Sequence, residues 1–205
     1  MNKITRTLLL SAMLLSPAIS TAADPGEDAY KVCAGCHGFR GEGNELVNAP
    51  AVAALPAWYV SRQLRNYRDG IRGTDPAHPP GITMAQMALA LESDQQIADV
   101  AAYIEGLSPA ELKPTVSGDA DAGRSAYQPC AACHGDKAQG NESLNAPPLA
   151  GLSDWYQVVQ LKNFKTGVRG KNPKDTYGQQ MAPMAQTLDE NAMHNVVAFI
   201  NTLEP

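Results

Sequence analysis

The sequence is poor in basic residues, in long apolar segments and in the alternating pattern that is typical of β-strands. Its 205 residues include 16 Lys and Arg against 21 Asp and Glu, which gives a formal net charge of −5. An acidic surface argues against nucleic acid as a partner. No segment beyond residue 23 approaches the roughly 20 apolar residues that a membrane-spanning helix needs. Without alternating runs to predict strands, we expect an all-α chain.

The first 23 residues have the pattern of a secretory signal peptide. Lys3 and Arg6 precede an apolar stretch from Leu8 to Leu15, and small residues follow it. This order of positive, apolar and small residues is typical of a cleaved export signal. An uncleaved membrane anchor is the alternative, but the apolar stretch is shorter than a spanning helix requires. We therefore expect residues 1–23 to be removed and the mature chain to act outside the cytoplasm.

The rest of the chain is an internal repeat. Cys130 lies 97 positions after Cys33, and the same offset aligns most of the second half with the first half. Matching stretches are Gly43-Asn44-Glu45 with Gly140-Asn141-Glu142, Asn48-Ala49-Pro50 with Asn145-Ala146-Pro147, and Trp58-Tyr59 with Trp155-Tyr156. Such self-similarity indicates a duplicated unit. Residues 109–118, with two prolines and little apolar content, are predicted to link an N-terminal domain at 24–108 to a C-terminal domain at 119–205.

Apolar residues recur at helical spacing in three segments of each unit. The predicted helices are Asp28–Cys36, Ala57–Arg68 and Ser93–Leu107, then Arg124–Cys133, Trp155–Lys165 and Glu190–Leu203. The loops between them are rich in Gly, Pro and Asn, and loops of this length are unusual unless a ligand organises them. A unit this small also buries little core, so a large flat cofactor at its centre would stabilise it.

Both units carry the motif Cys-x-x-Cys-His. It consists of Cys33, Cys36 and His37 in the first unit and of Cys130, Cys133 and His134 in the second. In this motif each cysteine can form a thioether to a haem vinyl group, and the histidine binds the iron. A redox-active cysteine pair is expected near a βαβ pattern, a zinc site needs a fourth ligand, and a disulfide would not require the histidine. The motifs therefore predict two covalently bound haems c.

Methionines are the candidates for the second axial ligand of each iron. Met84 and Met87 of the first unit recur as Met181 and Met184 of the second. A thioether opposite the histidine closes the iron and favours electron transfer. The members of each pair could share one helical face, and spacing alone does not choose between them, since the other methionine would fill core space. The alternative imidazole ligands are His78 and His194, which do not occupy equivalent positions.

Two further pairs of residues recur near the motifs. The backbone carbonyls of Pro50 and Pro147 are candidates to accept the second ring N–H of each haem-binding histidine, although turn formation would also explain these prolines. Arg72 and Arg169 could pair with the haem propionates, because arginine suits carboxylates. An exposed surface role is the alternative for both arginines.

Together, these motifs resemble the dihaem cytochrome c4 family. They are the two Cys-x-x-Cys-His-Gly motifs, the stretch Asn145–Gly151, Tyr-x-x-x-Gln-Leu in the middle helix, and Met-x-x-Met-Ala-x-x-Leu before the last helix. The resemblance covers essentially the whole mature chain and implies two tandem class I cytochrome c domains in the periplasm. It also implies that Met84 and Met181 bind the irons. Residues 49–54 depart from the family, because the Leu-Ala-Gly that follows the proline is missing there.

The hypothesis is a monomeric electron carrier rather than an enzyme. The expected partners are a terminal oxidase, a quinol–cytochrome c reductase or a periplasmic dehydrogenase, with peripheral association with membrane complexes as a further expectation. A haem enzyme, such as a peroxidase or a thiosulfate-oxidising cytochrome, is the first alternative and needs one open iron. A fixed haem subunit of a membrane complex is the second. Residues 24–108 carry 6 basic and 11 acidic groups against 7 and 9 in 119–205, so the domains could favour different partners.

Overall fold

The computed structural model describes residues 24–203, and the predicted signal peptide at 1–23 lies outside this range. Its regular elements are α1 (Pro25–His37), η1 (Glu45–Val47), α2 (Ala57–Arg68), α3 (Pro79–Ala88), α4 (Asp94–Gly106), α5 (Ala120–His134), η2 (Glu142–Leu144), α6 (Asp154–Thr166), α7 (Thr176–Gln186) and α8 (Glu190–Ile200). The described part of the chain is therefore all-α, as predicted. Among its helices, none has the length and apolar character to cross a bilayer.

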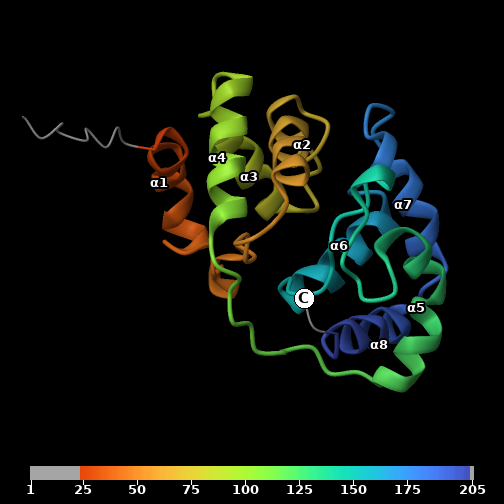
Figure 1. The fold of residues 1–205 in the computed structure, drawn as a ribbon. Helices are drawn as coiled ribbons and strands as arrows, with labels where there is room; N and C mark the ends of the chain where they lie inside the picture. The colour runs from red at the N-terminus through yellow and green to blue at the C-terminus, as the bar shows by residue number, and fades with distance from the viewer. Residues whose placement is uncertain (1–23, 204–205) are drawn as a thin grey trace, which may run out of the picture.

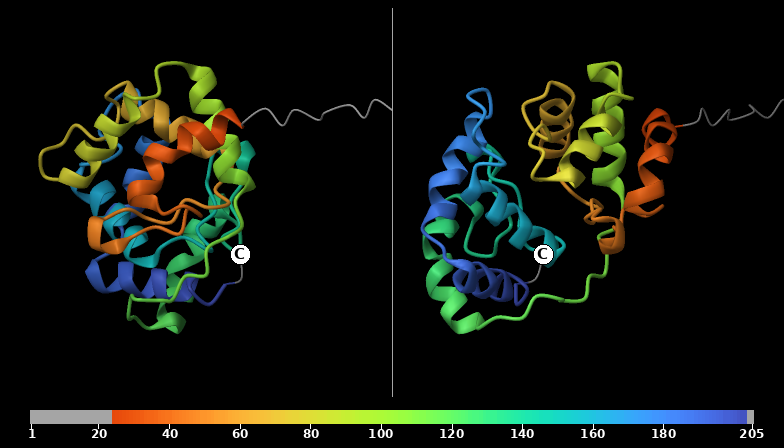
Figure 2. Two further views of the ribbon diagram at one scale, coloured as in Figure 1. Left: turned by 90° about the vertical axis from the view of Figure 1, so that its left-hand side faces the viewer. Right: turned by 180° about the vertical axis from the view of Figure 1, so that it is seen from behind.

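The helices form two groups that follow each other along the chain. Helices α1–α4 lie together on one side of the molecule and α5–α8 on the other (Figure 1). No helix occurs between Gly106 and Ala120, and this segment runs as an extended connection from one group to the other, as the right-hand view of Figure 2 shows. The repeat in the sequence thus corresponds to two helical bundles of the same element order.

Local capping explains where several helices begin and end. Ser93 accepts a hydrogen bond from the backbone N–H of Gln96, whose side chain returns to the backbone of Ser93, and this capping box starts α4. Asp119 caps α5, which begins four residues before the predicted start at Arg124. Helices α1 and α5 both end at a glycine with φ near 80°, Gly38 and Gly135, a conformation that favours glycine. These ends fall directly after the two Cys-x-x-Cys-His motifs.

Helices α3 and α7 correct the prediction of three helices in each domain. Their residues were predicted as loops because prolines and glycines interrupt the apolar pattern, yet each domain has four α-helices within 24–203. Helix α3 opens with two prolines at positions that tolerate them, and α7 contains Pro183. Both helices carry the methionine pairs, so the missed elements are those that bring the candidate iron ligands to the core.

Each domain core lies where its first and last helices cross. In the N-terminal domain, Ile97, Val100 and Ile104 of α4 are buried against Tyr30 of α1. The corresponding crossing in the C-terminal domain joins α5 to α8. Gly26 and Gly123 sit at the two crossings, where an added Cβ would lie 2.3 Å from Asp99 O and 1.9 Å from Asn195 O. A side chain at either position would push the helices apart.

Candidate functional site

The helix crossings position the two Cys-x-x-Cys-His motifs at the C-terminal ends of α1 and α5. Cys33 and Cys130 are half-buried and pack against the cores, while Cys36 and Cys133 are exposed. Neither motif forms a disulfide in the described chain. A buried tyrosine three residues before the first cysteine of each motif fixes the end of its helix. The Tyr30 hydroxyl donates to Gly38 O at 2.8 Å, and the Tyr127 hydroxyl donates to Gly135 O at 2.8 Å.

The two motif histidines make the same hydrogen bond in both domains. Nδ1 of His37 lies 2.8 Å from the carbonyl oxygen of Pro50, and Nδ1 of His134 lies 2.8 Å from that of Pro147. A carbonyl only accepts, so Nδ1 carries the proton and Nε2 keeps a free lone pair. Burial lowers the pKa of both histidines, although each carbonyl contact acts in the opposite direction. Neutral imidazoles with a fixed orientation are suited to binding iron.

The candidate methionines lie on α3 and α7. Met84 packs against the buried cluster of the N-terminal domain. In the C-terminal domain, Met181 and Met184 line the same cavity of about 190 Å³, so the geometry leaves open which of the two binds iron. This cavity is also lined by both motif cysteines and the motif histidine of α5. One space therefore collects every group that the sequence predicts for haem attachment in that domain.

Arg72 lies at the contact between the domains and is buried, with 7% of its surface exposed. Its guanidinium donates to Gln63 Oε1 at 2.7 Å within its own domain, and to Tyr156 Oη and Gln160 Oε1 of the other domain, each at 2.8 Å. The alternative of an exposed surface role is therefore wrong for Arg72. No contact among the described residues tests its pairing with a propionate, which stays a prediction.

Arg169 repeats these contacts from the other side of the interface. It donates to Gln160 Oε1 at 2.8 Å within its own domain, and to Gln63 Oε1 at 3.1 Å and Tyr59 Oη at 3.4 Å across the interface. The two arginines and two glutamines thus form a pseudo-twofold cluster in which each glutamine oxygen accepts from both arginines. Such a cluster fixes the relative orientation of the domains through charge-assisted hydrogen bonds.

Three buried nitrogen atoms beside this cluster have no hydrogen-bond partner within residues 24–203. They are Arg62 Nε, Gln160 Nε2 and Arg169 Nε. All three side chains line the cavity of the C-terminal domain. Buried donors without partners are costly, and carboxylates are their natural acceptors. Because a haem carries two propionate carboxylates, this part of the cavity fits the polar edge of a haem, just as its cysteines fit the vinyl groups.

Arg62 is a site residue that the sequence analysis missed. It lies within the predicted helix Ala57–Arg68 and reaches across to Asn145 in the other domain, with Nη1 2.9 Å from Oδ1 and Nη2 3.0 Å from the carbonyl oxygen. A signal was present in the repeat, because Arg62 aligns with the apolar Val159. A charged residue that breaks an otherwise close repeat indicates a role specific to one domain.

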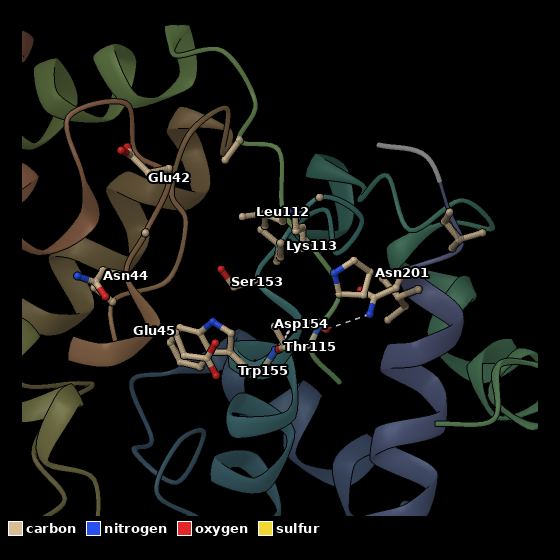
Figure 3. A pocket seen from close by; sticks show the side chains of 18 residues that line it. Glu42, Asn44, Glu45, Leu112, Lys113, Thr115, Ser153, Asp154, Trp155 and Asn201 are labelled. Atoms are coloured by element: carbon tan, nitrogen blue, oxygen red, sulfur yellow. Dashed lines mark hydrogen bonds between the residues drawn. The ribbon is translucent and has the colours of Figure 1, made fainter. Parts of the chain in front are cut away.

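Asp154 is a second missed residue, and it holds the linker. Its carboxylate accepts from Thr115 N at 2.6 Å, Val116 N at 2.7 Å and Asn201 Nδ2 at 3.1 Å. Figure 3 shows Asp154 beside Thr115 of the linker and Asn201 at the end of the last helix, in the lining of a cavity of about 330 Å³ to which the linker also contributes. Within the described residues, its lining contains no cysteine, histidine or methionine, so this cavity is separate from the haem-attachment groups.

Comparison with known proteins agrees with this geometry. The profile of the cytochrome c family matches residues 23–108 and 120–204. A thiosulfate dehydrogenase electron acceptor of Thiomonas intermedia (strain K12) is 33% identical over 184 residues, covering 84% of this chain and 80% of that protein. Cytochrome c4 of Azotobacter vinelandii is 30% identical over 217 residues, covering 96% and 98%. The crystal structure of reduced cytochrome c4 from Pseudomonas stutzeri has a TM-score of 0.69 at 25% identity, covering 89% and 99%.

Two domains that repeat one haem-attachment geometry define a dihaem c-type cytochrome. The chain belongs to the cytochrome c family and, within it, to the dihaem cytochrome c4 proteins. It binds two haems c and transfers electrons between redox partners, and cytochrome c4 proteins are carriers rather than enzymes. In general they are exported proteins, either periplasmic or associated with membranes. The predicted family, fold class, cofactors and carrier function are thereby confirmed.

Proposed function

We propose that each haem is held by the residues that recur between the domains. In the N-terminal domain the thioethers would form on Cys33 and Cys36, and the iron ligands would be His37 and Met84. In the C-terminal domain the thioethers would form on Cys130 and Cys133, and the iron ligands would be His134 and Met181. Pro50 and Pro147 would orient the histidines, and Arg72 and Arg169 would face the propionates. A haem held by these residues would supply one-electron chemistry, through the ferric and ferrous states of its iron. The methionine thioether would occupy the second axial position of each iron and would exclude a substrate from it.

The proposed location is the periplasm, with residues 1–23 as the cleaved signal peptide. The proposed organisation is a domain at 24–108, a linker at 109–118 and a domain at 119–205. The support is the segment without helices between Gly106 and Ala120, and its attachment to Asp154 through Thr115 and Val116. A linker held in this way keeps two covalently loaded domains in one orientation as a monomeric carrier.

The proposed partner is a periplasmic dehydrogenase that oxidises thiosulfate. The observation that carries this proposal is the similarity to proteins named thiosulfate dehydrogenase electron acceptor, at 33% and 31% identity over more than four-fifths of this chain. Joining two thiosulfate ions through a sulfur–sulfur bond releases two electrons. Two haems in one chain can accept both electrons before the carrier leaves. A terminal oxidase is the proposed acceptor of the electrons downstream.

The N-terminal domain is the proposed docking side for the dehydrogenase. Phe39 and Leu46 are 83% and 93% exposed; Phe39 lies two residues after His37, and Leu46 lies in η1, the next element of the chain. The aligned residues of the C-terminal domain are Asp136 and Ser143. The N-terminal domain also carries the larger acidic excess, so a partner with a basic rim around an apolar patch fits it.

Rapid mixing with a thiosulfate dehydrogenase and thiosulfate tests this function. The oxidised protein should take up two electrons per chain, at a rate that falls steeply with ionic strength. Phe39→Asp, which copies the C-terminal domain, should slow the reaction by about tenfold, whereas Asp136→Ala at the aligned exposed position of the C-terminal domain should slow it by less than about twofold. Equal slowing by both variants would contradict docking on the N-terminal domain. Reduction by a quinol–cytochrome c reductase but not by the dehydrogenase would contradict the proposed partner.

A further inference from the structure

Arg62 extends from the N-terminal domain into the haem cavity of the C-terminal domain. We propose that it binds a propionate of the C-terminal haem, so that the docking of one domain sets the reduction potential of the haem in the other. This inference rests on the proposed attachment of a haem at Cys130, Cys133 and His134. It assigns a haem-binding role to a residue that lies outside the repeated motifs and outside the domain that attaches this haem.

The contacts of Arg62 hold its guanidinium at the wall of the cavity. Both terminal nitrogens donate to Asn145, at 2.9 Å to the side-chain oxygen and 3.0 Å to the carbonyl oxygen. The ring of Tyr177 lies beneath it, with 4.7 Å between the guanidinium carbon and the ring centroid, and Trp58 lies at 5.0 Å. These contacts fix the side chain, and of the three guanidinium nitrogens Nε is the one without a hydrogen bond within residues 24–203.

That nitrogen has no acceptor among the described residues. Arg62 Nε is buried and unpartnered, and no ion pair within residues 24–203 includes Arg62. Burial lowers the pKa of Arg62, and the like charge of Arg169 adds to this effect, while Asp175 acts in the opposite direction. Asp175 is buried and lines the same cavity, but it forms no ion pair with Arg62 or Arg169 within residues 24–203. Two cations in one half-buried place without a paired anion are unfavourable. A carboxylate in the cavity would satisfy Arg62 Nε and compensate both charges.

Within the described chain, the C-terminal domain has no contact with the N-terminal domain that is equivalent to that of Arg62 with Asn145. Val159 aligns with Arg62 and has no charge to extend into the N-terminal domain. Arg72 and Arg169, in contrast, are equivalent to each other and act on both sides of the interface. Arg62 therefore adds one cation to the surroundings of the C-terminal haem alone. A cation beside a haem stabilises the ferrous state, because reduction adds a negative charge.

The test is a spectroelectrochemical titration of the full-length holoprotein and its variants. The two haems are distinguished by NMR, through contacts of their substituents with Cys36 or with Cys133. Arg62→Gln should shift the reduction equilibrium of the C-terminal haem about tenfold toward the oxidised state, which is about 59 mV for one electron. The reduction equilibrium of the N-terminal haem should change by less than about twofold, because the C-terminal domain has no arginine at the position equivalent to Arg62. Arg62→Lys keeps the charge but loses the fork geometry, so its shift should be about threefold.

Arg65→Gln is the matched control, because it removes the same charge from the same helix. The Arg65 side chain is partly exposed, with Nε 3.6 Å from Asp94 Oδ1. Arg65→Gln should change the reduction equilibrium of neither haem by more than about twofold. Equal shifts of both haems in Arg62→Gln, or a loss of thermal stability with unchanged potentials, would overturn the inference. If Arg62→Gln does not fold, an unshifted potential in Arg62→Lys overturns it instead. A wild-type chain with fewer than two haems would contradict the proposed haem attachment, which is a separate failure.

Discussion

The two domains keep the same haem-attachment geometry but differ where they face each other and the solvent. The hydrogen bond from each motif histidine to its proline carbonyl is 2.8 Å in both. The two domains differ at other aligned positions: Arg62 aligns with Val159, Ala57 with Asp154, and Phe39 with Asp136. The constant part is what a covalent haem requires. The variable part decides how the domains dock and which partner each one meets.

The largest expected effect is the loss of one haem from either domain. Replacing Cys130 and Cys133 together by Ala should remove one of the two haems and unfold the domain that held it, because a domain of this size depends on its cofactor for a core. The matched replacement of Cys33 and Cys36 should do the same in the other domain. Mass spectrometry and far-UV circular dichroism measure the outcome. Two haems retained in either variant would refute the assignment of that motif.

Replacing the axial methionines should open one iron at a time. In Met181→Ala the C-terminal haem should bind carbon monoxide, with uptake rising to about one molecule per chain, and its potential should fall. Met184→Ala should bind none and should lose only packing. The equivalent pair, Met84→Ala and Met87→Ala, should behave in the same way in the N-terminal domain. Carbon monoxide binding to Met184→Ala in place of Met181→Ala would exchange their roles.

The interface arginines should differ in their contribution to stability. Arg72→Ala removes three short hydrogen bonds from a buried site and should lower the free energy of unfolding by about 3 kcal/mol. Arg169 is half-buried and its contacts across the interface are longer, so Arg169→Ala should cost about 1.5 kcal/mol. Chemical denaturation measures both. The exposed control Arg40→Ala should stay within about 0.5 kcal/mol. Equal losses of stability in Arg72→Ala and Arg169→Ala would contradict the expected difference between them.

The linker should loosen in acid, and this is the smallest expected effect. Burial acts to raise the pKa of Asp154, but the hydrogen bonds from Val116 and Thr115 outweigh it and hold the pKa below its usual range. A depressed pKa in the folded state means that the stabilisation is complete above the unfolded value of about 3.9 and is lost as the pH falls below it. The protection factors of the Thr115 and Val116 amides, which compare the observed exchange with the intrinsic rate at each pH, should therefore fall below about pH 4.

Asp154→Asn is the control for this acid effect. It removes the titrating carboxylate, so the protection factors of the two linker amides should be low already at neutral pH and should no longer change on acidification. An unchanged acid profile in Asp154→Asn would mean that another group holds the linker.

The sequence predicted the parts of the fold that depend on local patterns. The predicted bounds Ala57–Arg68 are those of α2, and the helix predicted from Ser93 is α4, which Ser93 caps. Helix α3 was missed because Pro79 and Pro80, which a helix tolerates at its first turn, continue a loop rich in proline, and α7 was missed because Pro183 disfavours a helix interior. The packing of Met84 onto the N-terminal core is a tertiary contact that no local pattern records.

The contacts between the domains were not predictable from one domain at a time. Arg62 and Asn145 lie 83 positions apart in the sequence, and no local pattern records that they meet. The repeat nevertheless contained the information in another form. Positions that break the repeat, such as Arg62 and Asp154, are those that the structure places at the domain contact and at the linker.

The central claim is that a methionine occupies the second axial position of both irons, as an electron carrier of this kind requires. Carbon monoxide binding to the reduced wild-type protein tests this claim most directly. Optical spectra of the purified holoprotein, recorded before and after addition of the gas, should show no shift in either haem. Binding at about one haem per chain would mean an open iron. That result would contradict the carrier function and would favour a haem enzyme.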